Sequence, residues 1–242
     1  MAKSDPEIAR LLADLDASAK RTIRAAVDAL IALAANSGEL REILEQELTN
    51  RARNNRWPIA YVLATAGQVS PGSLEILLET LGDPDADIRW AVLLLMVRLG
   101  KTDARIPALI GRLLDAGSPT QRRMALYCIR DLSLADDIAI PAFLKGLKDP
   151  EALVRVAGII GLKKRTAPPE TVTSRMLDLF LHDPDARVRS AAAVVLAELE
   201  MASDEFLAGL EVASRSENPQ IKKAAIAALS LLQNKRSASS GS

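Results

Sequence analysis

The side chains that most often carry out catalysis are scarce in this chain of 242 residues. Cys128 is its one cysteine and His182 its one histidine. A cysteine nucleophile needs a base within hydrogen-bond reach, and no second histidine lies near Cys128 in the sequence to supply one. A lone histidine also has no partner with which to bind a metal ion. We therefore expect a packed or groove-lining thiol and a surface or capping histidine.

Paired carboxylates, which can serve as a general acid and a general base, fall at the predicted starts of helices. Asp136 and Asp137 are neighbours, and Asp183 and Asp185 lie two residues apart. The N-terminal end of a helix is partly positive and stabilises such side chains without any catalytic role. The sequence has no glycine-rich phosphate loop and no Gly-x-Ser-x-Gly motif. It predicts a protein that is not an enzyme and that has no cofactor and no metal ion.

Large apolar side chains at a spacing of four residues indicate binding instead. Residues four apart lie on one face of a helix. Both tryptophans of the chain and one of its two tyrosines have this spacing. Exposed together, such side chains mark interaction sites, and Trp and Tyr are frequent energetic anchors. The predicted partner-binding residues are Trp57, Tyr61, Trp90, Leu94, Met124, Cys128, Val156 and Ile160.

These residues are positioned by an internal repeat. The segment Asp83-Pro84-Asp85-Ala86-Asp87-Ile88-Arg89 recurs from Asp149 to Arg155 and from Asp183 to Arg189. Weaker copies place Arg24, Arg56, Arg123 and Lys222 at the position of the arginine. The seven basic positions, 24, 56, 89, 123, 155, 189 and 222, follow one another at intervals of 32 to 34 residues. A period near 33 residues indicates seven repeats.

Each repeat is expected to form two helices. The first helix has apolar residues at helical spacing, as in Leu74, Leu77, Leu78 and Leu81. The first aspartate of the motif is predicted to cap the second helix, with the following proline in its first turn. No segment has the alternating pattern of a strand. One helix pair cannot bury its apolar face alone, so stacked pairs are expected to form an all-α solenoid.

The motif Asp-Pro-x-x-x-[Ile/Val]-Arg, followed by an alanine-rich helix, resembles the HEAT repeat, and most closely the bacterial type named from phycobilisome lyases. The resemblance covers residues 5–233 and implies one right-handed α-α superhelix of about seven helix pairs. It also implies a ladder of Asp and Arg side chains between neighbouring repeats, and it places the second helices on the concave surface. Residues 234–242 are expected to be a flexible tail or an expression-vector remnant.

Two positions in each second helix lie away from the buried face. They are the second and sixth residues after the apolar residue that precedes the basic one, and we call them the row positions. In repeats two to five they hold the eight predicted binding residues. The resemblance places this row in the concave groove, where it would suit an amphipathic helix or an extended peptide of another protein. In a tightly curved superhelix the same row would be ordinary core.

Charge separates the remaining alternatives. Lys and Arg together number 31, as do Asp and Glu, so the overall charge does not favour nucleic acid, although some HEAT-like proteins are DNA glycosylases. Residues 101–165 carry a basic surplus, which we expect to be a solvated face or to steer an acidic partner protein. Its candidate residues are Arg122, Arg123, Arg130, Lys163 and Lys164.

The family resemblance leaves two further functions open. One is a chromophore-lyase-like or other enzyme subunit, although HEAT-like hydroxylases bind iron through His-Glu pairs and here His182 is followed by Asp183. The other is self-association through the ends of the solenoid. A protein-binding scaffold is the expected function. With one cysteine and no long apolar segment, we expect a cytoplasmic protein that does not bind membranes.

Overall fold

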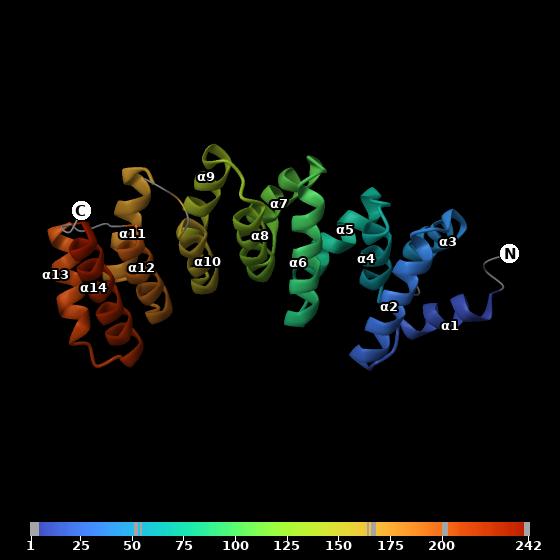
Figure 1. Cartoon of the computed structure of the whole chain (residues 1–242), viewed down its shortest axis with the longest axis horizontal. Coiled ribbons are helices and arrows are strands. Elements are labelled where there is room, and N and C mark those ends of the chain that lie inside the picture. Colours follow the sequence, from blue (N-terminus) through green and yellow to red (C-terminus); the bar gives the residue numbers. More distant parts are fainter. Residues whose placement is uncertain are drawn as a thin grey trace. The chain divides into compact units, whose positions relative to one another are not determined.

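The structure, a computed structural model, describes residues 5–50, 53, 55–163, 165, 168–199 and 203–239, with side chains up to residue 234. The described residues form 14 α-helices and no strand, which confirms the all-α prediction (Figure 1). The helices are α1 (Pro6–Asp14), α2 (Lys20–Ala34), α3 (Gly38–Thr49), α4 (Trp57–Thr65), α5 (Pro71–Thr80), α6 (Ala86–Gly100), α7 (Arg105–Ala116), α8 (Pro119–Leu132), α9 (Asp136–Leu147), α10 (Ala152–Leu162), α11 (Glu170–His182), α12 (Ala186–Glu198), α13 (Asp204–Ser214) and α14 (Pro219–Ser239).

The chain divides into two compact units, residues 1–106 (unit 1) and residues 107–242 (unit 2). Helices α1 to α6 belong to unit 1, and α8 to α14 belong to unit 2. Within each unit, an odd-numbered helix and the even-numbered helix after it form one of the predicted pairs. The single domain expected over residues 5–233 stays a prediction.

The second helices of successive pairs stack on one another. In unit 1, α4 contacts both α2 and α6, and in unit 2, α10 contacts both α8 and α12. Their buried faces are mostly aliphatic and contain no aromatic ring, as expected from a composition with few aromatic residues. The close approach of α9 and α10 depends on glycine: a Cβ added to Gly161 in α10 would meet the ring of Phe143 in α9 at 2.1 Å. The alternation of small and large residues therefore fixes how α9 and α10 pack.

The second helices begin two residues later than the sequence predicts. The N-caps of α6 and α12 are Asp85 and Asp185, whose carboxylates accept hydrogen bonds from backbone amides in the first turn. The first aspartate of each motif, Asp83 or Asp183, accepts the amide of that N-cap residue instead, at 2.7 and 2.9 Å. The prediction that Asp83 and Asp183 cap the helices is therefore wrong. Each one instead orders the turn that precedes the helix through this bond, and the following proline lies in that turn, outside the helix.

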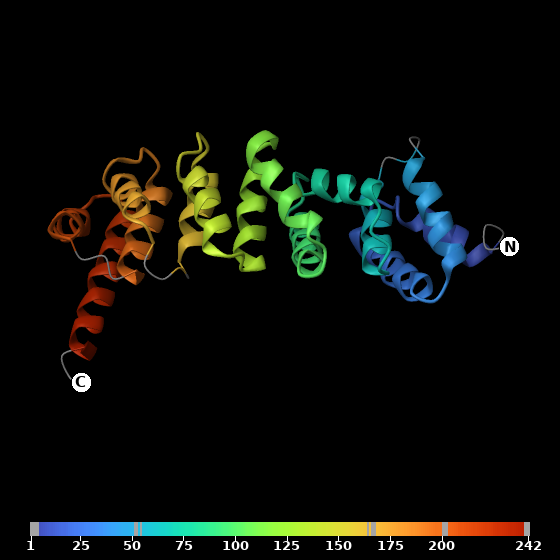
Figure 2. The ribbon, with the colours of Figure 1, turned by 90° about the horizontal axis from the view of Figure 1, so that it is seen from above.

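The C-terminal helix α14 continues to Ser239 and projects beyond the other helices of unit 2 in Figure 2. It thus enters the segment 234–242 that we expect to be a tail, and the flexibility of that segment stays a prediction. Among the described residues, no helix combines the length and apolar character that crossing a membrane requires.

Candidate functional site

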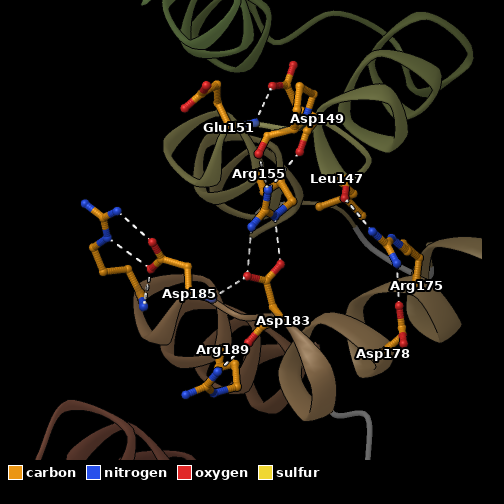
Figure 3. A network of polar contacts seen from close by, with 11 residues as sticks. Leu147, Asp149, Glu151, Arg155, Arg175, Asp178, Asp183, Asp185 and Arg189 are labelled. Carbon is orange, nitrogen blue, oxygen red and sulfur yellow. Dashed lines mark hydrogen bonds and ion pairs between the residues drawn. The ribbon is translucent and has the colours of Figure 1, made fainter. Parts of the chain in front are cut away.

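A ladder of arginine and aspartate side chains fixes the register of the second helices in unit 2. Nε and Nη2 of Arg155 donate to the two carboxylate oxygens of Asp183, at 2.7 and 2.9 Å (Figure 3). Nη1 of Arg155 donates to the carbonyl oxygens of Asp149 and Pro150. The arginine thus holds the turn of its own repeat through carbonyls and the turn of the next repeat through a carboxylate.

The preceding repeat contains the same arrangement. Arg122 donates from Nε and Nη2 to the carboxylate of Asp149, at 2.7 and 2.8 Å, and from Nη1 to the carbonyl of Gly117. The hydrogen bonds to Asp149 raise the pKa of Arg122. Burial alone would raise the pKa of Asp149, but the hydrogen bonds from Arg122 and from the amide of Glu151 lower it on balance. The ladder is therefore a charged, partly buried connection between neighbouring repeats.

The ladder corrects the register of the fourth repeat by one residue. Arg122, not Arg123, occupies the ladder position. It lies four residues after the N-cap Ser118, just as Arg155 lies four residues after the N-cap Glu151. The row positions of α8 are consequently Arg123 and Tyr127, and the residues that we assigned there belong one position further along the helix.

That shift explains why two predicted binding residues lie in the core. Met124 is 1% exposed and Cys128 is fully buried. The prediction that they line an open groove is therefore wrong, because they occupy core positions of α8. Burial raises the pKa of the Cys128 thiol to about 12, with a smaller contribution from Asp131. Such a thiol stays protonated at neutral pH and is a poor nucleophile.

The row positions of unit 1 reach the surface. Trp90 and Leu94, one turn apart on α6, are 40% and 63% exposed, whereas Val92, Leu93 and Leu95 of the same helix are buried. On the neighbouring helix α4, Trp57 and Tyr61 are half-buried and meet edge to face, with ring centroids 6.4 Å apart. These four residues form what we call the unit 1 face.

In unit 2, the corrected row contains one aromatic residue that the sequence analysis missed. Tyr127 is half-buried, and the guanidinium of Arg130 lies over its ring, 5.0 Å from the centroid. Val156 and Ile160 follow on α10 and are also half-buried. The constant distance of four residues from N-cap to ladder arginine is the signal that identifies Tyr127 as a row residue.

The predicted basic surplus is largely engaged within the chain. Arg122 belongs to the ladder. Arg130 forms two hydrogen bonds to Asp131, at 2.6 and 3.0 Å, which raise its pKa, and Lys163 pairs with Glu198 at 2.9 Å. Arg123 is half-buried at a row position, and Lys164 lies outside the described residues.

His182 is exposed at the last position of α11. Within the ranges that the structure describes, no group of three or more His, Cys, Asp or Glu side chains is placed so that it could hold a metal ion. The arrangement of side chains offers an apolar contact face and a structural ladder.

Comparison with known proteins supports the repeat assignment. Residues 106–197 match the family model described as HEAT repeats. The deoxyhypusine hydroxylase of Aspergillus clavatus is 33% identical over 109 residues, which are 42% of this chain and 32% of that protein. The chain thus spans about a third of the length of that relative.

Two solved structures are also similar. The crystal structure of YibA from Escherichia coli is 16% identical and has a TM-score of 0.54 over 95% of this chain and 92% of its own. The complex of CpcE and CpcF, the phycocyanin lyase of Nostoc sp. PCC7120, has a chain that is 20% identical, with a TM-score of 0.39 over 93% of this chain and 92% of its own. The likeness to YibA concerns the fold alone.

Proposed function

Because this chain is a HEAT-repeat protein, we propose that it is a non-catalytic scaffold that holds a segment of another protein against the unit 1 face. The observation that carries the proposal is the exposure of Trp90 and Leu94, one turn apart, on a helix whose buried residues are all apolar. Exposed large apolar side chains that are grouped on one face favour a partner that removes them from water. Neither residue fills a core position.

A partner with an amphipathic helix fits this face best. Apolar side chains at a spacing of three and four residues on the partner would cover Trp90 and Leu94, and the edge of the Trp57–Tyr61 pair would border the contact. A tryptophan can contribute a large share of the binding energy at such a contact, because it buries much apolar surface with few rotatable bonds. Charges around the face would set the orientation of the partner.

The absence of catalysis is part of the proposal. The hydroxylase relative aligns over about a third of its own length. The buried, protonated Cys128 and the exposed His182 also give no pair of reacting groups. We further propose that the chain works in the reducing cytoplasm of a bacterium, where a single buried thiol needs no partner.

The test is a selection of binding peptides from a displayed library of amphipathic helices, with the full chain immobilised. Dissociation constants of the selected peptides are then measured by fluorescence anisotropy for the wild-type chain and for Trp90→Ala. We expect a loss of about 1–4 kcal/mol in binding free energy for Trp90→Ala.

The matched control is Ile138→Ala, which removes an apolar side chain that is 54% exposed on α9, a first helix. It should leave the affinity unchanged. Peptides that bind wild type and a folded Trp90→Ala chain equally well would contradict the proposal.

A further inference from the structure

The C-terminal part of unit 2 contains a cavity of about 770 Å³ where α11, α12, α13 and α14 meet. We call it the terminal pocket. We propose that it is a second binding site, which takes an acidic and apolar peptide segment of a partner protein and holds an aspartate or glutamate side chain on Arg189. This inference is independent of the unit 1 face.

The proposal starts from a break in the ladder. Asp149 and Asp183 each lie six residues before the ladder arginine of their own repeat, and each receives the forked donors of the preceding arginine. In the last repeat, Lys222 occupies the basic position, and the residue six before it is Ser216. Ser216 keeps the local turn, because its hydroxyl accepts the amide of Asn218 at 3.2 Å. It has no carboxylate for Arg189.

Arg189 is therefore a ladder arginine without a forward carboxylate, as is Arg89 in unit 1, whose Nη1 donates to the carbonyl of Asp83 and whose buried Nε has no acceptor among the described residues. Nη1 of Arg189 donates to the carbonyl of Asp183, as Arg155 does to that of Asp149. Among the described residues, its Nε and Nη2 have no acceptor, whereas the same atoms of Arg155 hold the carboxylate of Asp183. Arg189 and Ser216 both line the terminal pocket. A carboxylate that entered the pocket would find the two donors that the preceding repeat uses internally.

The remaining lining determines what else the ligand carries. Phe180, Leu181, Val212 and Ile221 give the pocket apolar walls, and Val212 is 75% exposed. Helix α13 approaches α11 closely at Gly209, where an added Cβ would meet Leu181 at 2.7 Å, so these walls are in contact with one another. A bulky apolar side chain next to the carboxylate would cover them. The pocket does not suit a small hydrophilic anion, because most of its wall offers no hydrogen bond.

Charge in the pocket favours an acidic segment. The lining includes two arginines, Arg189 and Arg215, and one carboxylate, that of Glu205. Within the described residues, none of the three forms an ion pair. The lining thus has one positive charge in excess. A peptide with a carboxylate balances this excess charge. A neutral peptide would cover the guanidinium of Arg189 and leave its Nε and Nη2 without an acceptor. Leaving a buried charged donor unpaired is costly, so the acidic side chain should dominate recognition.

The test uses the full chain and a fluorescein-labelled, amidated peptide, Leu-Leu-Asp-Leu-Leu. The control peptide has the same sequence with Asn in place of Asp. We expect the Asp peptide to bind and the Asn peptide to bind at least about tenfold more weakly, since the amide cannot accept both donors of the fork. Arg189→Gln should weaken binding of the Asp peptide by a similar factor. Arg187→Gln, which changes an exposed arginine on the same helix, is the matched control and should leave binding unchanged.

A second variant tests the same proposal through a gain of stability as well as a loss of peptide binding. Ser216→Asp supplies the missing carboxylate within the chain. We expect it to raise the melting temperature by a few degrees, as a closed ladder connection should, and to abolish binding of the Asp peptide. Equal binding of the Asp and Asn peptides, unchanged binding to Ser216→Asp, or no binding to the wild-type chain would each overturn the proposal. So would a dimer of the wild-type chain that Arg189→Gln dissociates, because the occupant would then be a second copy.

Discussion

Arg155 and Asp183 join two successive repeats through two parallel hydrogen bonds between residues 28 positions apart in the sequence. Their side chains are 10% and 3% exposed, so the pair is shielded from water on nearly all sides. The same arginine also holds the turn that precedes its own helix. One side chain therefore connects the start of α10 to the start of α12.

Asp183→Asn should destabilise the chain by about 3 kcal/mol, because it leaves the guanidinium of Arg155 buried without its counter-charge. Urea unfolding followed by circular dichroism measures the change. Asp178→Asn is the matched control, since it removes the same charge from an exposed pair with Arg175. That variant should cost no more than about 1 kcal/mol. Similar losses for both variants would contradict the structural role given to the ladder.

The ladder should also contribute to stability in a pH-dependent way through Asp149. The pKa of Asp149 is lower in the folded chain than in the unfolded chain, where aspartate titrates near 3.9. Its contribution is therefore fully present above the unfolded pKa and is lost as the pH falls below about 4. The free energy of unfolding of Asp149→Asn should lie well below that of wild type at pH 7, and the difference should shrink at pH 3. A difference of equal size at both pH values would count against this assignment.

Cys128 should resist thiol reagents in the folded chain. With a pKa raised from 9.0 to about 12, its thiolate fraction at pH 8 falls by about a thousandfold, and burial also blocks access. The rate of reaction with a disulfide reagent, measured at pH 8, should rise sharply once urea unfolds the chain. Rapid labelling without unfolding would show that the thiol opens to solvent more readily than its position in α8 implies.

The two residues Trp90 and Met124, both predicted to bind a partner, should behave differently when each is replaced by alanine. Met124→Ala leaves a cavity in the core and should cost about 2–5 kcal/mol of stability. Trp90→Ala removes a side chain that is 40% exposed and should cost less than about 1 kcal/mol. Thermal unfolding of the two variants measures the contrast. A larger loss for Trp90→Ala would mean that its ring serves the core.

The period of the repeat and the helix pairs could be predicted from the sequence because three copies of the motif keep their prolines and arginines in register. The fourth repeat does not. Its Pro119 lies just inside the helix, whereas Pro84 lies before the N-cap of α6. Because Arg122 and Arg123 are consecutive, the sequence pattern does not show which of the two occupies the ladder position. The N-cap position depends on local backbone geometry, and that geometry is absent from a pattern of residue types.

The exposure of the row could be predicted only in part. Trp90 and Leu94 are where helical periodicity places them, and so are the half-buried Trp57 and Tyr61. Because the predicted register of α8 was wrong by one residue, Met124 and Cys128 were assigned to the row and Tyr127 was not. The terminal pocket could not be predicted, because it depends on how α13 approaches α11 at Gly209. Such close contacts between helices follow from three-dimensional packing.

The sequence separation between each ladder arginine and the aspartate of the next repeat determines which insertions can lengthen this architecture. Each intact connection joins an arginine to an aspartate 27 or 28 residues further along. Duplicating residues 149–182 in tandem would bring the copied aspartate opposite the original Arg155 and leave the copied arginine opposite Asp183. An insertion of a whole number of periods thus preserves these two connections, whereas an insertion of a fractional period would separate an arginine from its aspartate. Gene duplication could therefore extend such a protein without first disrupting its fold.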